Sequence, residues 1–189
     1  RQLFDAQQFC FLFAPAYHPL VGTVMPVRRT LATATIFNLA GPLANPTSPP
    51  VQLMGVCDEA LLVPMADVLQ RIGCQRGLVV YGAGLDEVAP HEQTRAMLVE
   101  PDEIVPMTID VGEFGLTPRP LSTIQLEAGD DAKAVFDAVL EGTADDAKID
   151  MVAINTGTLL WLAQQAPSLK AGADMARTAL TEGRVAAHL

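Results

Sequence analysis

The stretch VQLMGVCDEALLVPMADVLQRIGCQRGLVVY, residues 51–81, decides the fold class. The apolar runs at its two ends, Val51–Val56 and Gly77–Tyr81, have the length and composition of buried strands. Between them, Asp58 can cap a helix that ends at Gly73. The apolar residues of this helix recur every three or four positions: Leu61, Leu62, Met65, Ala66, Leu69 and Ile72. A helix between two uniformly apolar strands predicts parallel strands in a sheet covered on both faces.

The rest of the chain extends this pattern in both directions. Downstream, the sequence predicts two further strands and then three helices: Ala96–Val99, Ile104–Ile109, Ala132–Leu140, Ala144–Gln165 and Lys170–Gly183. Upstream, residues 1–32 read as helical with breaks, and a loop rich in proline and glycine follows at 38–46. We therefore expect an α/β fold with a mostly parallel sheet flanked by helices. Residues 1–35 are assigned to part of a small helical domain and 36–189 to an incomplete α/β domain.

Composition limits the possible functions. Half of the residues are hydrophobic and 18% are charged, as in folded globular proteins. The net charge of −10 and the lack of clustered Lys and Arg argue against a nucleic-acid partner. Cys10, Cys57 and Cys74 are too few and too scattered for a disulfide framework or a zinc site, which fits the cytoplasm. No apolar run reaches the roughly 20 residues that cross a membrane, so we expect no membrane partner.

Two adjacent acids, Asp86 and Glu87, follow the predicted strand that ends at Tyr81. Open α/β sheets bind ligands at the carboxyl ends of their strands. Paired carboxylates offer the oxygen ligands that Mg²⁺ prefers. The same pair could instead be a helix cap followed by an acid in the first turn. The acid pairs at 130–131 and 145–146 stand at predicted helix starts, where capping explains them.

His18 and Arg28 are the other candidates for a binding site. A guanidinium pairs bidentately with a carboxylate, and an aromatic acid also needs an apolar slot for its ring. These two residues lie ten positions apart with a break between them, so spacing alone leaves open a helix cap and a solvated arginine. Gly41 and Pro42 can form a rigid turn, and Asn45 either pins this loop or is purely structural.

Three segments, in their order and spacing, resemble the anthranilate phosphoribosyltransferase family. They are FLFAPAYHP (11–19) with MPVRRTL (25–31), TIFNLAGPLANP (35–46), and VVYGAGLDEV (79–88). The C-terminal tail, with Asn155 in an apolar helix, is also similar, and the resemblance covers nearly the whole chain. It implies the nucleoside-phosphorylase-like fold of this family and a homodimer formed through the small helical domain. It also implies transfer of a phosphoribosyl group from phosphoribosyl pyrophosphate (PRPP) to anthranilate in tryptophan biosynthesis.

The resemblance also implies roles for residues. It places one set around anthranilate: Ala14, Pro15, His18, Arg28, Gly41 and Pro42. It gives Asp86 and Glu87 the task of holding Mg²⁺ on PRPP. Arg29 is expected to face solvent, His91 and His188 receive no role, and no residue is assigned as a general base.

The chain departs from the family in what precedes these segments. The family carries a Gly-Thr-Gly-Gly-Asp loop that cradles pyrophosphate, an Asn-Val-Ser-Thr segment and a Lys-His-Gly segment, none of which occurs here. The sequence also opens at Arg1 with no methionine. We therefore expect a C-terminal piece of the enzyme that is inactive by itself and prone to association.

Two other functions remain open on sequence grounds. A pyrimidine-nucleoside phosphorylase shares the fold, although the segments at 41–46 and 85–87 look less like that family. A non-catalytic nucleic-acid-binding relative would need a basic groove, which the charge of −10 disfavours.

Overall fold

The computed structural model describes residues 2–18, 22, 30 and 41–188. Contacts divide the chain into two compact units, Arg1–Ser48 and Pro49–Leu189. The first unit contains helices α1 (Gln2–Gln7) and α2 (Ala14–Tyr17), and residues 41–43 are also helical. The domain boundary predicted at residues 35 and 36 lies outside the described residues and stays a prediction.

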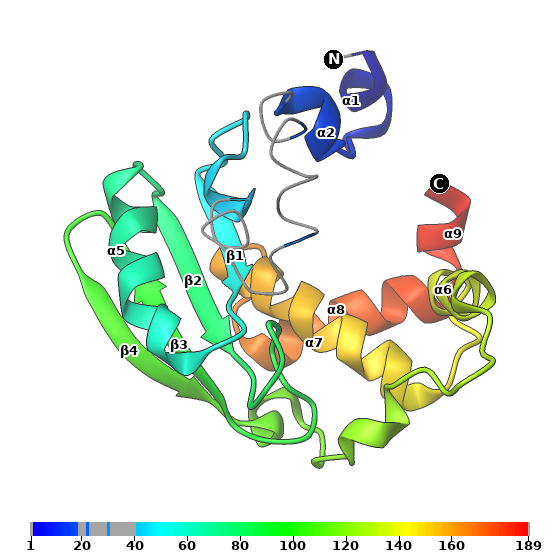
Figure 1. Cartoon of the computed structure of the whole chain (residues 1–189). Helices are drawn as coiled ribbons and strands as arrows, with labels where there is room; N and C mark the ends of the chain where they lie inside the picture. Colours follow the sequence, from blue (N-terminus) through cyan, green and yellow to red (C-terminus); the bar gives the residue numbers. More distant parts are fainter. Residues whose placement is uncertain (1, 19–21, 23–29, 31–40, 189) are drawn as a thin grey trace. The chain divides into compact units, whose positions relative to one another are not determined.

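The second unit is built on a four-stranded sheet in the order β1-β2-β3-β4 (Figure 1). Its strands are β1 (Val51–Gly55), β2 (Arg76–Tyr81), β3 (Thr94–Val99) and β4 (Ile104–Ile109). β1 and β2 are parallel, as predicted, and helix α5 (Leu62–Arg71) connects them. The Asp58 side chain accepts a hydrogen bond from the Ala60 N–H (2.9 Å), which caps the one-turn helix η1 (Glu59–Leu61) before α5.

The prediction of a mostly parallel sheet was wrong, because the sheet is mixed. β2 pairs with β3 and β3 pairs with β4 in antiparallel directions. Only residues 100–103 separate β3 from β4, and the Glu100 N–H donates to the Glu103 carbonyl (2.9 Å) across this turn. A parallel return needs a crossover of a dozen or more residues. Residues 82–93, between β2 and β3, contain no helix that could form such a crossover.

Helices cover both faces of the sheet. On one face α5 packs against β2 and β3, and Gly77 lies against Leu69. On the other face, α7 (Asp146–Leu162) contacts β1 and β2, and it also packs along α8 (Leu169–Thr181). The buried core joins β2, β3, α7 and α8 through Leu78, Val80, Val88, Ala96, Ile109, Phe114, Ile154, Leu162, Leu169 and Ala173. The α/β fold class is therefore confirmed.

The remaining elements lie between β4 and the C-terminus. They are η2 (Val111–Phe114), η3 (Leu121–Thr123), α6 (Ala132–Leu140) and α9 (Arg184–His188). Asp131 caps α6 as predicted, since its side chain accepts from the Lys133 N–H (2.9 Å). Asp145 stands at the start of α7 but makes no capping hydrogen bond, and it pairs with Lys148 (3.4 Å) instead. Among the described residues, no helix is long and apolar enough to span a membrane.

Candidate functional site

The acidic pair follows a tight turn at the end of β2. The Gly82 N–H donates to the Leu85 carbonyl (2.9 Å), and the Leu85 N–H donates to the Gly82 carbonyl (3.1 Å). The two residues between them, Ala83 (φ 49°) and Gly84 (φ 100°), have positive φ, which is the pattern of a tight hairpin turn. The chain therefore reverses sharply and brings Asp86 and Glu87 back toward the carboxyl ends of β1 and β2.

Two glycines make this return possible. A Cβ built on Gly55, the last residue of β1, would lie 1.5 Å from the Asp86 carbonyl oxygen. A Cβ on Gly82 would lie 2.2 Å from the Glu87 carbonyl oxygen. Backbone contact this close leaves no room for a side chain at either position. The main chain of the acidic pair is therefore seated directly on the ends of two neighbouring strands.

Two side chains hold the residues that follow the pair. The Val88 N–H donates to Oδ1 of Asn155 (2.8 Å), and Nδ2 of Asn155 donates to the Val88 carbonyl (3.1 Å). The Ala89 N–H donates to the fully buried Oγ1 of Thr94 (2.8 Å). The Val88 side chain is itself buried in the core. The segment from Gly82 to Ala89 is thus anchored on both sides of the acidic pair.

The carboxylates of Asp86 and Glu87 behave differently from their backbone. Both residues are exposed, and neither side chain makes a hydrogen bond or an ion pair with the part of the chain that the structure describes. No helix begins at either residue, so the capping explanation is excluded. Partial desolvation, together with the neighbouring charge of Asp86, raises the pKa of Glu87.

This arrangement fits Mg²⁺. The two carboxylates offer hard oxygen ligands, and a cation would offset both causes of the raised pKa of Glu87, partial desolvation first and then the charge of Asp86. No cluster of three or more His, Cys, Asp or Glu side chains suited to a metal occurs within the described ranges. A site with one or two protein carboxylates is usual for Mg²⁺, which keeps several waters and bridges substrate phosphates.

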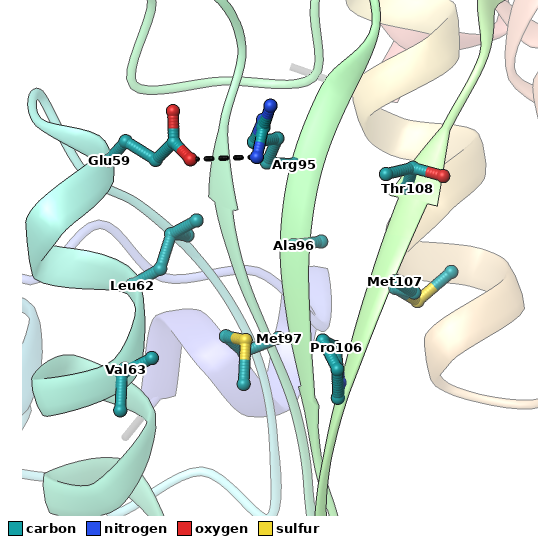
Figure 2. A pocket seen from close by; sticks show the side chains of 9 residues that line it. All are labelled: Glu59, Leu62, Val63, Arg95, Ala96, Met97, Pro106, Met107 and Thr108. Carbon is teal, nitrogen blue, oxygen red and sulfur yellow. Dashed lines mark ion pairs between the residues drawn. The ribbon is translucent and has the colours of Figure 1, made fainter.

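A pocket of about 400 Å³ (Figure 2) begins at the end of the sheet where β2 finishes, the same end that carries the acidic pair. Arg95, which is paired in register with Tyr81 at the end of β2, forms an ion pair with Glu59 (3.0 Å). The pocket then runs between α5 and strands β3 and β4 along mostly apolar side chains. Because Glu59 already neutralises Arg95, this pocket does not offer a free cation to a phosphate.

The residues expected around anthranilate belong to the first unit. Ala14 and Pro15 lie in α2, and the half-buried His18 follows it. Arg28 lies outside the described residues, as does Arg29. Because Arg28 is not among the described residues of the unit Arg1–Ser48, the grouping of these side chains into one site stays a prediction.

Gly41 and Pro42 are exposed, and their conformation differs from the expected turn. Residues 41–43 are helical, and the Ala44 N–H donates to the Gly41 carbonyl (3.2 Å). The helix therefore ends in this segment. Asn45 does pin the following turn, because its Oδ1 accepts from the Thr47 N–H (3.0 Å) and from Oγ1 of Thr47 (2.8 Å).

A buried charge in α7 escaped the sequence analysis. Asp150 is 3% exposed, pairs with Arg177 of α8, and lies 3.4 Å from a guanidinium nitrogen of Arg119. Arg177 also pairs with Asp146. Apolar neighbours in the sequence hid this aspartate, and the partners lie 27 and 31 residues away from it.

Comparison with known proteins now places the chain. A family described as "Glycosyl transferase family, a/b domain" matches residues 1–186. The chain belongs to this family. The anthranilate phosphoribosyltransferase of Sorangium cellulosum (strain So ce56) is 44% identical over 190 residues, which cover 100% of this chain and 54% of that protein. The enzyme of the same name from Prochlorococcus marinus (strain MIT 9313) is 45% identical over 176 residues, covering 92% and 50%.

Solved structures give the same result. The anthranilate phosphoribosyltransferase of Thermus thermophilus superposes with a TM-score of 0.86 at 34% identity, over 99% of this chain and 55% of that one. The Saccharomyces cerevisiae enzyme in complex with PRPP and Mg gives 0.87 at 27% identity, over 99% and 54%. The same enzyme has been solved with 4-fluoroanthranilate. The chain spans about half the length of these relatives, and the likeness confirms both the resemblance and the nucleoside-phosphorylase-like fold.

Proposed function

We propose that the protein carrying this chain transfers the phosphoribosyl group of PRPP to the amine of anthranilate, in tryptophan biosynthesis. The observation that carries the proposal is the match to anthranilate phosphoribosyltransferases along nearly the whole chain, at both sequence and structure level. A relative solved with PRPP and Mg, and with an anthranilate analogue, indicates the substrate classes. The charge of −10 and these relatives give no support to a nucleic-acid-binding role.

The proposed division of labour follows the two units. In the first unit, Arg28 would pair with the anthranilate carboxylate, beside an apolar slot formed by Ala14, Pro15, His18, Gly41 and Pro42. In the second, Asp86 and Glu87 would hold Mg²⁺, which neutralises negative charge on the departing pyrophosphate. Support for the second assignment is the exposed, unpaired acid pair on a backbone fixed by Gly55 and Gly82.

The reaction makes modest demands on the protein's own acids and bases. A bond forms between the amine nitrogen and C1 of the ribosyl group, and the bond from C1 to the pyrophosphate oxygen breaks. The amine is neutral before attack and gives up one proton afterwards. Because the nucleophile needs no prior deprotonation, orientation contributes more than general base catalysis. We assign no general base in this chain.

Loss of anthranilate fluorescence, in the presence of PRPP and Mg²⁺, tests the reaction. We expect turnover by the full-length protein and none by residues 1–189 alone, because the segments that cradle pyrophosphate in the family do not occur in this sequence. No consumption of anthranilate by the full-length protein would overturn the proposal. A melting temperature raised by thymidine and phosphate, and unaffected by anthranilate, would favour a nucleoside phosphorylase.

Asp86→Asn and Glu87→Gln test the metal assignment in the full-length protein. Each removes one anionic oxygen ligand. The Mg²⁺ concentration that gives half the maximal rate should therefore rise at least about tenfold, because losing a residue that only supports a metal ligand already weakens binding by about this factor. Glu92→Gln is the matched control, because this nearby acid is also exposed. Equal Mg²⁺ dependence in all three variants would remove Asp86 and Glu87 from the site.

We further propose a cytoplasmic homodimer in which the small helical domain carries the contact. This rests on the family resemblance alone. Light scattering on the full-length protein, together with cell fractionation, tests both points. A monomer at micromolar concentration, or recovery outside the cytoplasm, would contradict them.

A further inference from the structure

Asn155 is a polar residue in the apolar middle of α7. Its Oδ1 accepts from the Val88 N–H (2.8 Å), and its Nδ2 donates both to the Val88 carbonyl (3.1 Å) and to the Met151 carbonyl one turn earlier (3.0 Å). An amide side chain has two donor hydrogens and one acceptor oxygen. All three groups therefore have hydrogen-bond partners, and two of them pair with the backbone N–H and carbonyl of one residue, Val88.

This pairing links elements that are far apart in the sequence. Asn155 and Val88 are separated by 67 positions, and Val88 is the residue directly after Glu87. The Val88 side chain is completely buried, so without Asn155 its N–H and carbonyl would have to find other partners in a dry environment. Asn155 therefore determines where the main chain goes immediately after the acidic pair.

We infer that Asn155 is a positioning residue for Mg²⁺ binding, acting through the backbone of Asp86 and Glu87; this rests on the proposed function. Gly55 and Gly82 lie directly against the carbonyl groups of the acidic pair. After it, the Asn155 amide fixes Val88. Since the two carboxylates have no partners of their own among the described residues, only the backbone can determine their separation and direction. A metal site loses affinity when its ligands are not held in place.

Asn155→Leu tests this role, because leucine has a similar size and cannot pair with Val88. In the metal-free, full-length protein, amide hydrogen exchange at Val88 should become at least about tenfold faster than in the unaltered protein, with little change in β3. The Mg²⁺ concentration for half-maximal rate should rise about tenfold, within the range for outer-shell partners, while the rate at saturating Mg²⁺ falls less than about threefold.

Leu162→Val is the matched control, because it removes one methylene from the core about two turns further along α7. It should lower the melting temperature without changing Val88 exchange or the Mg²⁺ requirement. If Asn155→Leu changes neither quantity while Asp86→Asn raises the Mg²⁺ requirement, the inference about Asn155 fails and the proposed function stands. If Asp86→Asn has no effect either, the magnesium assignment fails first. Exchange that rises equally throughout the protein would reduce Asn155 to a purely structural residue.

Discussion

At the scale of single residues, the acidic pair combines a fixed backbone with free side chains. The carbonyls of Asp86 and Glu87 contact glycines, and the amides of Val88 and Ala89 donate to the half-buried Asn155 and the buried Thr94. Their carboxylates meanwhile stay exposed and unpaired within the described structure. Such an arrangement costs stability in the absence of a ligand, and sites that bind ligands commonly show it.

Gly55→Ala should disrupt this arrangement. The new Cβ would lie 1.5 Å from the Asp86 carbonyl oxygen, so either the loop or β1 must move. We expect a loss of about 3 kcal/mol or more in the free energy of unfolding, the upper range for overpacking. Urea denaturation measures this loss. Gly112→Ala is the control, since its Cβ would meet nothing within 4 Å, and a similar loss in both variants would refute the explanation.

Glu87 also gives the protein a pH dependence. Its pKa is raised, chiefly by partial desolvation and then by Asp86, so folding is favoured when this carboxyl is protonated. The stability of the metal-free protein should therefore fall as pH rises from about 4, the ordinary glutamate range, through the raised folded pKa. Glu87→Gln should remove this decrease of stability with pH. At pH 7 the variant should have a higher melting temperature than the unaltered protein. Equal melting curves from pH 4 to pH 7 would argue against the shift.

The sequence could predict some of these residues and not others. Asp86 and Glu87 stood out because they follow an apolar strand, which is a local signal. The Asn155 contact crosses 67 positions, and the need for glycine at 55 arises from a loop that begins 27 positions later. Contacts of this kind depend on the tertiary fold, so no spacing rule reveals them.

At the scale of elements, α7 and α8 touch through their backbones. A Cβ on Gly157 would lie 2.3 Å from the Ala173 amide nitrogen, and one on Gly172 would lie 2.3 Å from the Gly157 carbonyl oxygen. In an ordinary helix, Gly→Ala stabilises by roughly 1 kcal/mol. Here Gly157→Ala should instead destabilise by about 2 kcal/mol, because the helices must separate. Thr156→Ala, at the exposed neighbouring position, is the control for calorimetry, and a stabilising Gly157→Ala would exclude close packing.

The same pair of helices shares the buried charge of Asp150. Arg177→Met would leave this carboxylate, which is 3% exposed, with only Arg119 at 3.4 Å. We expect a loss of about 3 kcal/mol, the lower end for breaking a buried pair. Adding Asp150→Asn should restore part of that loss, since the uncompensated charge disappears. Lys133→Met, which breaks an exposed pair with Asp137, should cost less than about 0.5 kcal/mol when measured in the same way.

Element types were more predictable than strand directions. The apolar runs located β1, β2 and β4, and residues 132–140 form α6 as predicted. Uniformly apolar strands suggested a parallel sheet, but burial on both faces also occurs when antiparallel strands are covered by helices. The better signal was the gap at residues 100–103, which is too short for a parallel return. α9 was missed because the predicted helix ended at Gly183, and only five residues, Arg184–His188, form it.

At the scale of the whole molecule, the two edges of the sheet are unequal. β4 carries Pro106, which has no N–H to donate and so discourages further pairing. β1 pairs with β2 on one side only among the described residues, and it carries no proline or charged residue that would block its other side. Proline and charged residues are what usually keep an edge strand from pairing with another chain.

We therefore expect residues 1–189, studied by themselves, to associate through β1. Light scattering coupled to size exclusion should show a mass above 20.1 kDa that grows with protein concentration. The charge of −10 makes copies repel one another, so association should strengthen when salt screens that repulsion. Ion-pair contacts between copies would show the opposite dependence, which distinguishes the two kinds of interface. A single monomeric species at every concentration and ionic strength would mean that the β1 edge is covered.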